Sequence, residues 1–67
     1  MKTTYDTNAD AVYISFQESE NLESALITKG DWPFHVDQDK EGEVIGIEVM
    51  EASSVFNQNF LDNCEKI

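Results

Sequence analysis

The feature that most constrains this chain is a regular alternation of apolar with other residues in three short segments. Apolar residues occupy every second position in each segment: Val12, Ile14 and Phe16; Trp32, Phe34 and Val36; and Ile45, Ile47 and Val49. Side chains two positions apart lie on the same face of a β-strand. The alternation therefore predicts three strands, each with one buried face.

Two further strands and one helix complete the expected architecture. The predicted strands are 2–5, 11–17, 22–29, 32–37 and 43–50. Because proline cannot donate a hydrogen bond, the strand at Pro33 is expected to lie at a sheet edge or to begin after the proline. From Ala52 onward, apolar residues recur at spacings of three and four, which predicts an amphipathic helix over 53–65. Ser53 or Ser54 is expected to cap its start, and Lys66 suits its C-terminal dipole.

An apolar helix stripe needs a partner, and the sheet offers one. We therefore expect an α+β domain of two layers. It would be an antiparallel β-meander of four to five strands, with one C-terminal amphipathic helix packed on one face. A chain of 67 residues forms a single domain, residues 1–67.

The composition indicates the cellular compartment in which the chain is expected. Cys64 is the only cysteine, so a disulfide within the chain is excluded. The apolar runs are far too short to span a membrane, and no signal peptide is recognisable at the start. We expect a cytoplasmic protein that does not bind membranes.

The charge balance is the most unusual property of the composition. Fourteen acidic residues face four lysines and no arginine, for a formal net charge of −10. Direct binding to nucleic acid needs a basic patch, which this composition argues against. An acidic surface either keeps a small protein soluble or binds a basic partner or a cation.

One segment resembles a calcium-binding loop. From Asp37 to Glu48, acidic oxygens stand at positions one, three, five and twelve and a glycine at six, as in an EF-hand. The flanking segments alternate like strands, however, so a β-hairpin with an acidic turn is the preferred interpretation. We expect no metal or cofactor. The weak cation candidates are Asp37, Asp39, Glu41 and Glu43.

No catalytic arrangement is recognisable. Asp6 and Asp10 flank a turn and are typical turn formers, and His35 has no partner at the spacing of a triad or a zinc site. We therefore predict that the chain is not an enzyme. A small enzyme that uses Asp6, Asp10 or His35 is the lesser alternative.

A second face of the sheet offers a contact surface. Tyr13 lies opposite the apolar face of its strand, together with Gly46 and Met50. Amphipathic aromatic residues and methionine are enriched at interfaces. The candidate interface residues are Tyr13, Trp32 and Met50. A homodimer would bury additional surface and so compensate for the small hydrophobic core.

Two segments together resemble the YuzE-like domains, small bacterial proteins of unknown function. YDTNADAVYI at residues 5–14 is similar to their opening pattern YD-x-x-AD-A-x-YI. Val36-Asp37 through Gly42, followed by VIGIEV at 44–49 and by Ala52-Ser53, is similar to their second signature. The resemblance covers about Lys2 to Ser53, and the chain departs from the pattern at 32–35 and after Ser53.

The resemblance implies a compact sheet-plus-helix domain and brings no catalytic or binding residues. Some YuzE-like proteins are thought to be encoded beside small toxin-like proteins, which implies an antitoxin-like role. We therefore expect a non-enzymatic protein-interaction module with a basic protein partner. A weak cation-binding domain that uses the acidic 37–43 turn is the alternative.

Overall fold

The computed structural model describes residues 1–16 and 27–67. In chain order the elements are β1 (Lys2–Asp6), β2 (Ala11–Ser15), β3 (Ile27–Lys29), β4 (Phe34–Gln38), β5 (Val44–Met50), α1 (Ala52–Val55), α2 (Gln58–Asn63) and β6 (Glu65–Lys66). The expected α+β class, with a sheet that dominates the fold, agrees with this arrangement.

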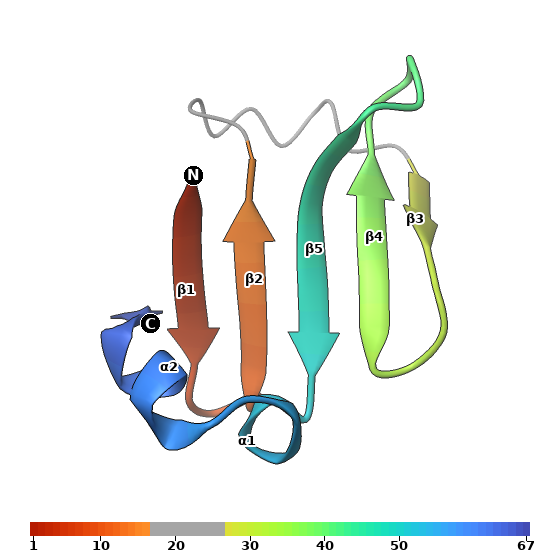
Figure 1. Ribbon diagram of the computed structural model, residues 1–67. Helices are drawn as coiled ribbons and strands as arrows, with labels where there is room; N and C mark the ends of the chain where they lie inside the picture. Colours follow the sequence, from red (N-terminus) through yellow and green to blue (C-terminus); the bar gives the residue numbers. More distant parts are fainter. Residues whose placement is uncertain (17–26) are drawn as a thin grey trace.

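The strands form one six-stranded sheet in the order β3-β4-β5-β2-β1-β6 (Figure 1). Neighbouring strands are antiparallel except β1 and β6, which are parallel. The sheet is therefore mixed and has more strands than expected. It is also not a simple meander, because β5 returns to pair with β2 and joins the β1–β2 hairpin to the β3–β4–β5 meander.

The strand register places the alternating apolar residues together. Ile14 lies opposite Ile47, which lies opposite Val36 on its other side. Val12 and Val49 form a neighbouring pair, and both are buried. This confirms the predicted common face, and a slip of one residue would move every one of these side chains to the other face.

The strand boundaries differ from the prediction around Pro33. Trp32 and Pro33 lie in a turn that the Phe34 N–H closes by donating to the Asp31 carbonyl at 2.7 Å, so β4 begins after the proline. β4 pairs with both β3 and β5, and the alternative of an edge strand is wrong. Of the predicted strand 22–29, residues 27–29 form β3, and residues 22–26 lie outside the described residues. Gln17, the last residue of the predicted strand 11–17, also lies outside them.

The single predicted helix over 53–65 is wrong, because two short helices form instead. The backbone is extended at Phe56 (φ −105°, ψ 152°) and at Asn57 (φ −72°, ψ 160°). The Asn57 side chain accepts a hydrogen bond from the Phe60 N–H at 2.8 Å and so starts α2. The break lets the rings of Phe56 and Phe60 stack with their centroids 4.5 Å apart.

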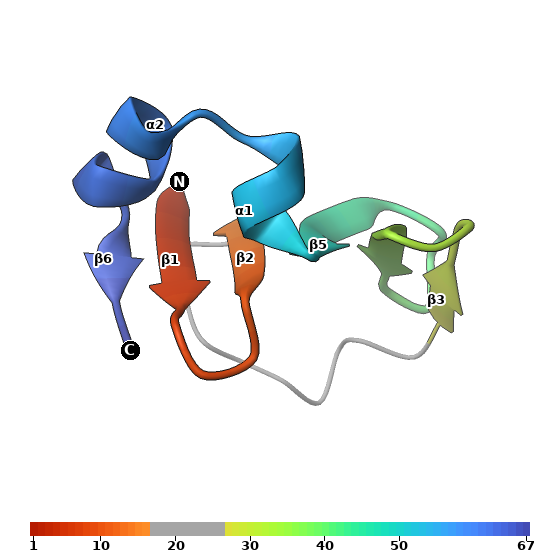
Figure 2. The ribbon, with the colours of Figure 1, turned by 90° about the horizontal axis from the view of Figure 1, so that it is seen from below.

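The core lies between these helices and the β1–β2 side of the sheet. Its buried cluster is Val12, Ala52 and Leu61, against which Tyr5, Ile14, Phe56 and Phe60 pack. Figure 2 shows α1 and α2 on one face of the sheet near β1 and β2, with no described helix over β3 and β4. No helix among the described residues is long and apolar enough to cross a membrane.

The end of α2 is fixed by Lys66. Its ammonium donates to the carbonyls of Leu61, Asp62 and Cys64 at 2.6, 3.1 and 2.9 Å. This confirms the expected interaction with the helix C-terminus, where a cation also meets a favourable dipole. β6 then follows and pairs with β1.

Candidate functional site

Asp10 joins the β1–β2 turn to the start of α1. Its Oδ1 accepts hydrogen bonds from the Tyr5 hydroxyl at 2.7 Å and from the Ser53 N–H at 2.9 Å. Its Oδ2 accepts from the Ser53 hydroxyl at 2.7 Å, and its carbonyl accepts from the Ala52 N–H at 2.8 Å. These bonds satisfy amide groups that the first turn of a helix leaves without partners.

The expected cap by Ser53 or Ser54 is therefore wrong. Glu51 stands at the N-cap position without a side-chain hydrogen bond, and Asp10 satisfies the helix start from another segment. Asp10 and Glu51 both have left-handed backbone (φ 53° and 54°). Aspartate is one of the few residues that adopt this conformation readily, which suits Asp10 to its position.

Hydrogen bonding lowers the pKa of the Asp10 carboxyl. The Ser53 hydroxyl contributes most, followed by the Tyr5 hydroxyl, and the Ser53 N–H adds to both, while desolvation opposes them. The same bond raises the pKa of Tyr5, with smaller contributions from desolvation and from the Asp10 charge. Asp10 is thus an ionised acceptor with three donors around it, which suits a structural role better than proton transfer.

Asp6 is a turn former as well. Its Oδ1 accepts from the N–H groups of Asn8 and Ala9 at 3.0 and 3.1 Å, which is the geometry of an Asx turn. The two carboxylates that the enzyme alternative relies on therefore both receive hydrogen bonds from the chain's own groups.

A second contact between distant segments crosses the other face of the sheet. The Tyr13 hydroxyl donates to Asp37 Oδ2 at 3.0 Å, from β2 across β5 to β4. The Tyr13 ring lies over Gly46, where a Cβ atom would collide with it. Burial, the hydrogen bond to Asp37 and the charges of Asp37 and Glu48 raise the pKa of Tyr13 to about 12.

The alternation in the sequence places Tyr13 and Gly46 on one face, but it does not predict the contact of Tyr13 with Asp37. A signal was present, because a glycine inside a β-branched strand often marks the close approach of another group. As a candidate interface residue, Tyr13 is half-buried within its own chain.

The acidic turn between β4 and β5 does not bring its carboxylates together. Asp37 is on the sheet beside Tyr13, whereas Asp39 Oδ1 accepts from the N–H groups of Glu41 and Glu43, both at 3.0 Å. The Asp39 N–H also donates to the Glu43 carbonyl at 2.9 Å, which confirms the hairpin. Residues 1–16 and 27–67 contain no group of three or more His, Cys, Asp or Glu side chains that could hold a metal. Weak cation binding here stays a prediction, which calorimetry with calcium tests.

An aromatic cluster lies at the end of the sheet where β4 begins. Trp32 is 60% exposed, and its Nε1 donates to Glu51 Oε2 at 3.2 Å. Its ring meets the ring of His35 edge-on, with centroids 6.0 Å apart, instead of lying in a row with Phe34 and Val36 as predicted. His35 is half-buried, and its Nδ1 lies 3.7 Å from Glu48 Oε1.

The helix-bearing face carries apolar side chains beyond the helices. Phe16 and Phe34 are 46% and 49% exposed, and Val36 and Ile47 are half-buried between them. We call these four residues, Phe16, Phe34, Val36 and Ile47, the open apolar face. Of the candidate interface residues, Met50 is half-buried and lies on the opposite face of β5.

The comparisons with known proteins concern the family alone. Searches of the curated proteins and of the solved structures gave no match. Residues 2–53 match a family described as "Protein of unknown function (DUF2283)". The matched range contains both contacts between distant segments, Asp10 with Ser53 and Tyr13 with Asp37. Because the match spans most of its length, this chain belongs to the DUF2283 family of proteins of unknown function.

Proposed function

We propose that this chain is a non-enzymatic protein-interaction module that binds a basic protein, in an antitoxin-like role. The observation that carries the proposal is the charge: fourteen acidic residues against four lysines, for a net charge of −10. Glu41, Glu43 and Glu51 are among the exposed carboxylates. A surface of one sign attracts a partner of the other sign and accelerates their encounter.

The polar network supports an interaction module over an enzyme. The carboxylates of Asp6, Asp10, Asp37 and Asp39 accept hydrogen bonds that fix turns, a helix start or a tyrosine. Catalytic acids and bases usually stand in a cleft with strongly perturbed pKa values and convergent polar groups. The network of this chain builds the fold instead.

The test is capture of partners from native lysate, with an unrelated acidic domain of the same net charge as the control bait. We expect one basic protein, bound in stoichiometric amount by this chain alone and released as salt rises, because salt screens the attraction. The antitoxin-like role further requires that the captured protein inhibits growth and that co-expression of this chain relieves the inhibition. The same background on both baits would contradict the proposal.

Self-association is part of the same proposal. The chain is small, and sedimentation velocity over a range of concentrations measures whether two copies associate. Tyr13→Lys is expected to weaken a dimer that uses the face of Tyr13 and Met50. A sedimentation coefficient that stays at the value of a monomer at all concentrations would contradict the homodimer.

A further inference from the structure

The open apolar face continues the core past the edge of the helix layer. Val36 and Ile47 belong to the same cross-strand row as Ile14, which packs against the core. Phe34 lies opposite Val49, and the Phe16 N–H donates to the Ile45 carbonyl at 2.9 Å, so two half-exposed rings flank the row. Figure 2 shows that α1 and α2 stop short of β4. Apolar sheet faces are normally covered by a second layer.

The dimensions of the face suit one helix. Neighbouring strands are about 4.8 Å apart, so the width from β5 to β3 is roughly 10 Å, close to the diameter of a helix. β5 has seven residues and is therefore about 23 Å long, which corresponds to a helix of about 15 residues. A single helix beside α1 would complete the layer.

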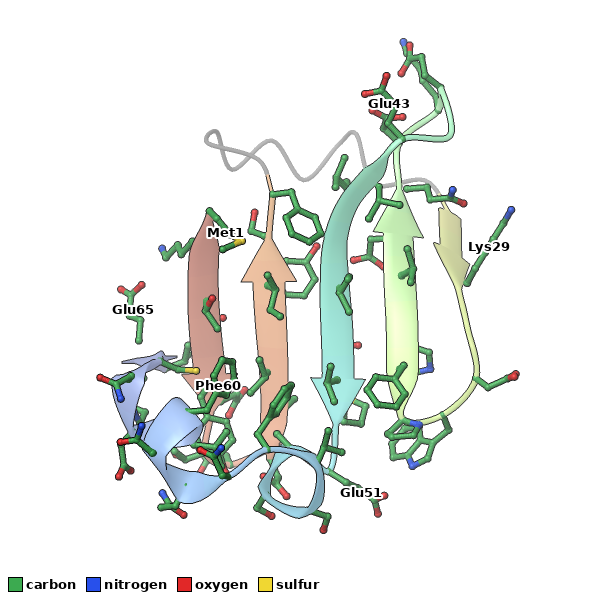
Figure 3. All side chains as sticks on the ribbon, viewed as in Figure 1. Met1, Lys29, Glu43, Glu51, Phe60 and Glu65 are labelled. Atoms are coloured by element: carbon green, nitrogen blue, oxygen red, sulfur yellow. The ribbon has the colours of Figure 1, made fainter. Side chains whose placement is uncertain are left out.

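The charges around the face favour a basic helix. Glu43 and Glu51 flank β5 at its two ends, as Figure 3 shows. Exposed Asp31 adds negative charge beside the start of β4, and exposed Glu41 adds negative charge in the turn, where Lys40 offsets only part of it. Exposed Lys29 lies opposite Val36 at the β3 edge of the face, midway between the two ends, so the acidic residues around the face still outnumber the lysines. A second copy of this chain would bring the same net charge of −10 against these residues, which argues against it as the occupant.

We propose that the open apolar face is the docking site for one amphipathic helix of a partner protein, with an apolar stripe and lysine or arginine residues near both ends. This inference rests on the proposed function and names the element of the basic partner that this chain binds. The apolar stripe covers Phe16, Val36 and Ile47, and the basic ends meet Glu43 at one end and Glu51 at the other. Such helix-in-groove recognition is a recurring mode of peptide binding.

The experiment titrates the full chain with a synthetic peptide of about 15 residues, followed by NMR. The peptide has leucines at helical i, i+3, i+4 and i+7 spacing and lysines near both ends. A control peptide of the same composition has its leucines scrambled, so it keeps the charge and loses the stripe. Phe34→Gln removes an exposed ring of the face, and Phe16→Gln is the second variant. Val44→Gln is the matched control, because Val44 is 45% exposed and points to the opposite face of β5.

We expect chemical-shift changes centred on Phe34, Val36 and Ile47, and a dissociation constant about tenfold higher in Phe34→Gln or Phe16→Gln but unchanged in Val44→Gln. Equal binding of both peptides, shifts centred elsewhere, or unchanged affinity in both Phe variants would overturn the inference.

A dimer of the wild-type chain that Phe34→Gln dissociates would also overturn it, because a second copy would then cover the face. Capture of a basic protein by Phe34→Gln at wild-type yield would overturn the docking site and leave the proposed function intact. Failure of the lysate capture alone would instead count against the proposed function.

Discussion

At the scale of single residues, two tyrosine–aspartate contacts organise this protein. Tyr5 donates to Asp10 on the same hairpin, and Tyr13 donates to Asp37 across a whole strand. The second contact depends on Gly46, because the ring lies where any larger residue would place its Cβ. Each contact can be tested separately.

We expect Gly46→Ala to lower the free energy of unfolding by about 1–3 kcal/mol, since the new methyl group displaces the Tyr13 ring. Urea denaturation measures the change. In a Tyr13→Ala background the same substitution should cost nothing, because alanine fits a strand better than glycine once the ring is gone. An equal cost in both backgrounds would show that another contact of Gly46 is responsible.

The Tyr13 hydroxyl should ionise near pH 12 rather than near 10.0, mainly because burial and the bond to Asp37 favour its neutral form. The unfolded chain loses this proton near its ordinary pKa. The stability that comes from Tyr13 is therefore fully present below pH 10 and is lost as pH rises through about 12. Ultraviolet absorbance titration of tyrosinate follows the ionisation. Asp37→Asn should move the pKa of Tyr13 back towards 10.0. The Tyr13→Phe variant shows the titration of Tyr5 alone, so the two tyrosine signals can be separated. A titration that Asp37→Asn leaves unaltered would contradict the contact.

At the scale of elements, short helices replace one long helix because side chains start and stop them. Asn57 starts α2 and the Lys66 ammonium binds carbonyls at its end. α1 starts on Asp10, a residue of the distant β1–β2 turn. With fewer than two turns each, such helices are not stable in isolation and depend on their caps and on packing against the sheet.

We expect Asn57→Ala to lower the free energy of unfolding by about 1 kcal/mol, the usual loss when a helix cap is removed. Thermal or urea unfolding measures it. Ser54→Ala is the control, because Ser54 is exposed and does not occupy the cap position of α1. The change at Ser54 should stay within about 0.5 kcal/mol. A larger loss at Ser54 than at Asn57 would restore the capping expected from the sequence.

At the scale of the whole molecule, the net charge of −10 acts on a core of few buried side chains. Like charges repel one another in the compact chain, and this repulsion opposes folding. The hydrophobic core at the β1–β2 side and the hydrogen-bonded turns have to outweigh it. The free energy of unfolding should consequently rise with ionic strength.

We expect added sodium chloride to raise the free energy of unfolding by roughly 0.5–1 kcal/mol between about 0.01 M and 0.15 M, as the screening length falls from about 30 to 8 Å. Urea denaturation at each salt concentration measures the effect. A Glu41→Gln, Glu43→Gln double variant carries less negative charge and should show a smaller rise. A fall in stability with salt would mean that attractive ion pairs outweigh the repulsion.

Several features followed from the sequence because they depend on local pattern. Alternation placed Val12, Ile47 and Val49 on one face, since side chains two apart share a face in any strand. The Asp39 turn followed from the preference of short polar side chains for turns. The position of Lys66 at a helix end followed from the helix dipole.

Tertiary structure decided what depends on partners far away in the chain. The pairing of β5 with β2, the parallel contact of β6 with β1 and the capping of α1 by Asp10 all join segments whose separation no local pattern encodes. The helix break at Asn57 likewise lets Phe56 and Phe60 stack beside the core. Local spacing fixes which face a side chain takes, whereas only packing of the whole chain fixes which neighbour it meets there.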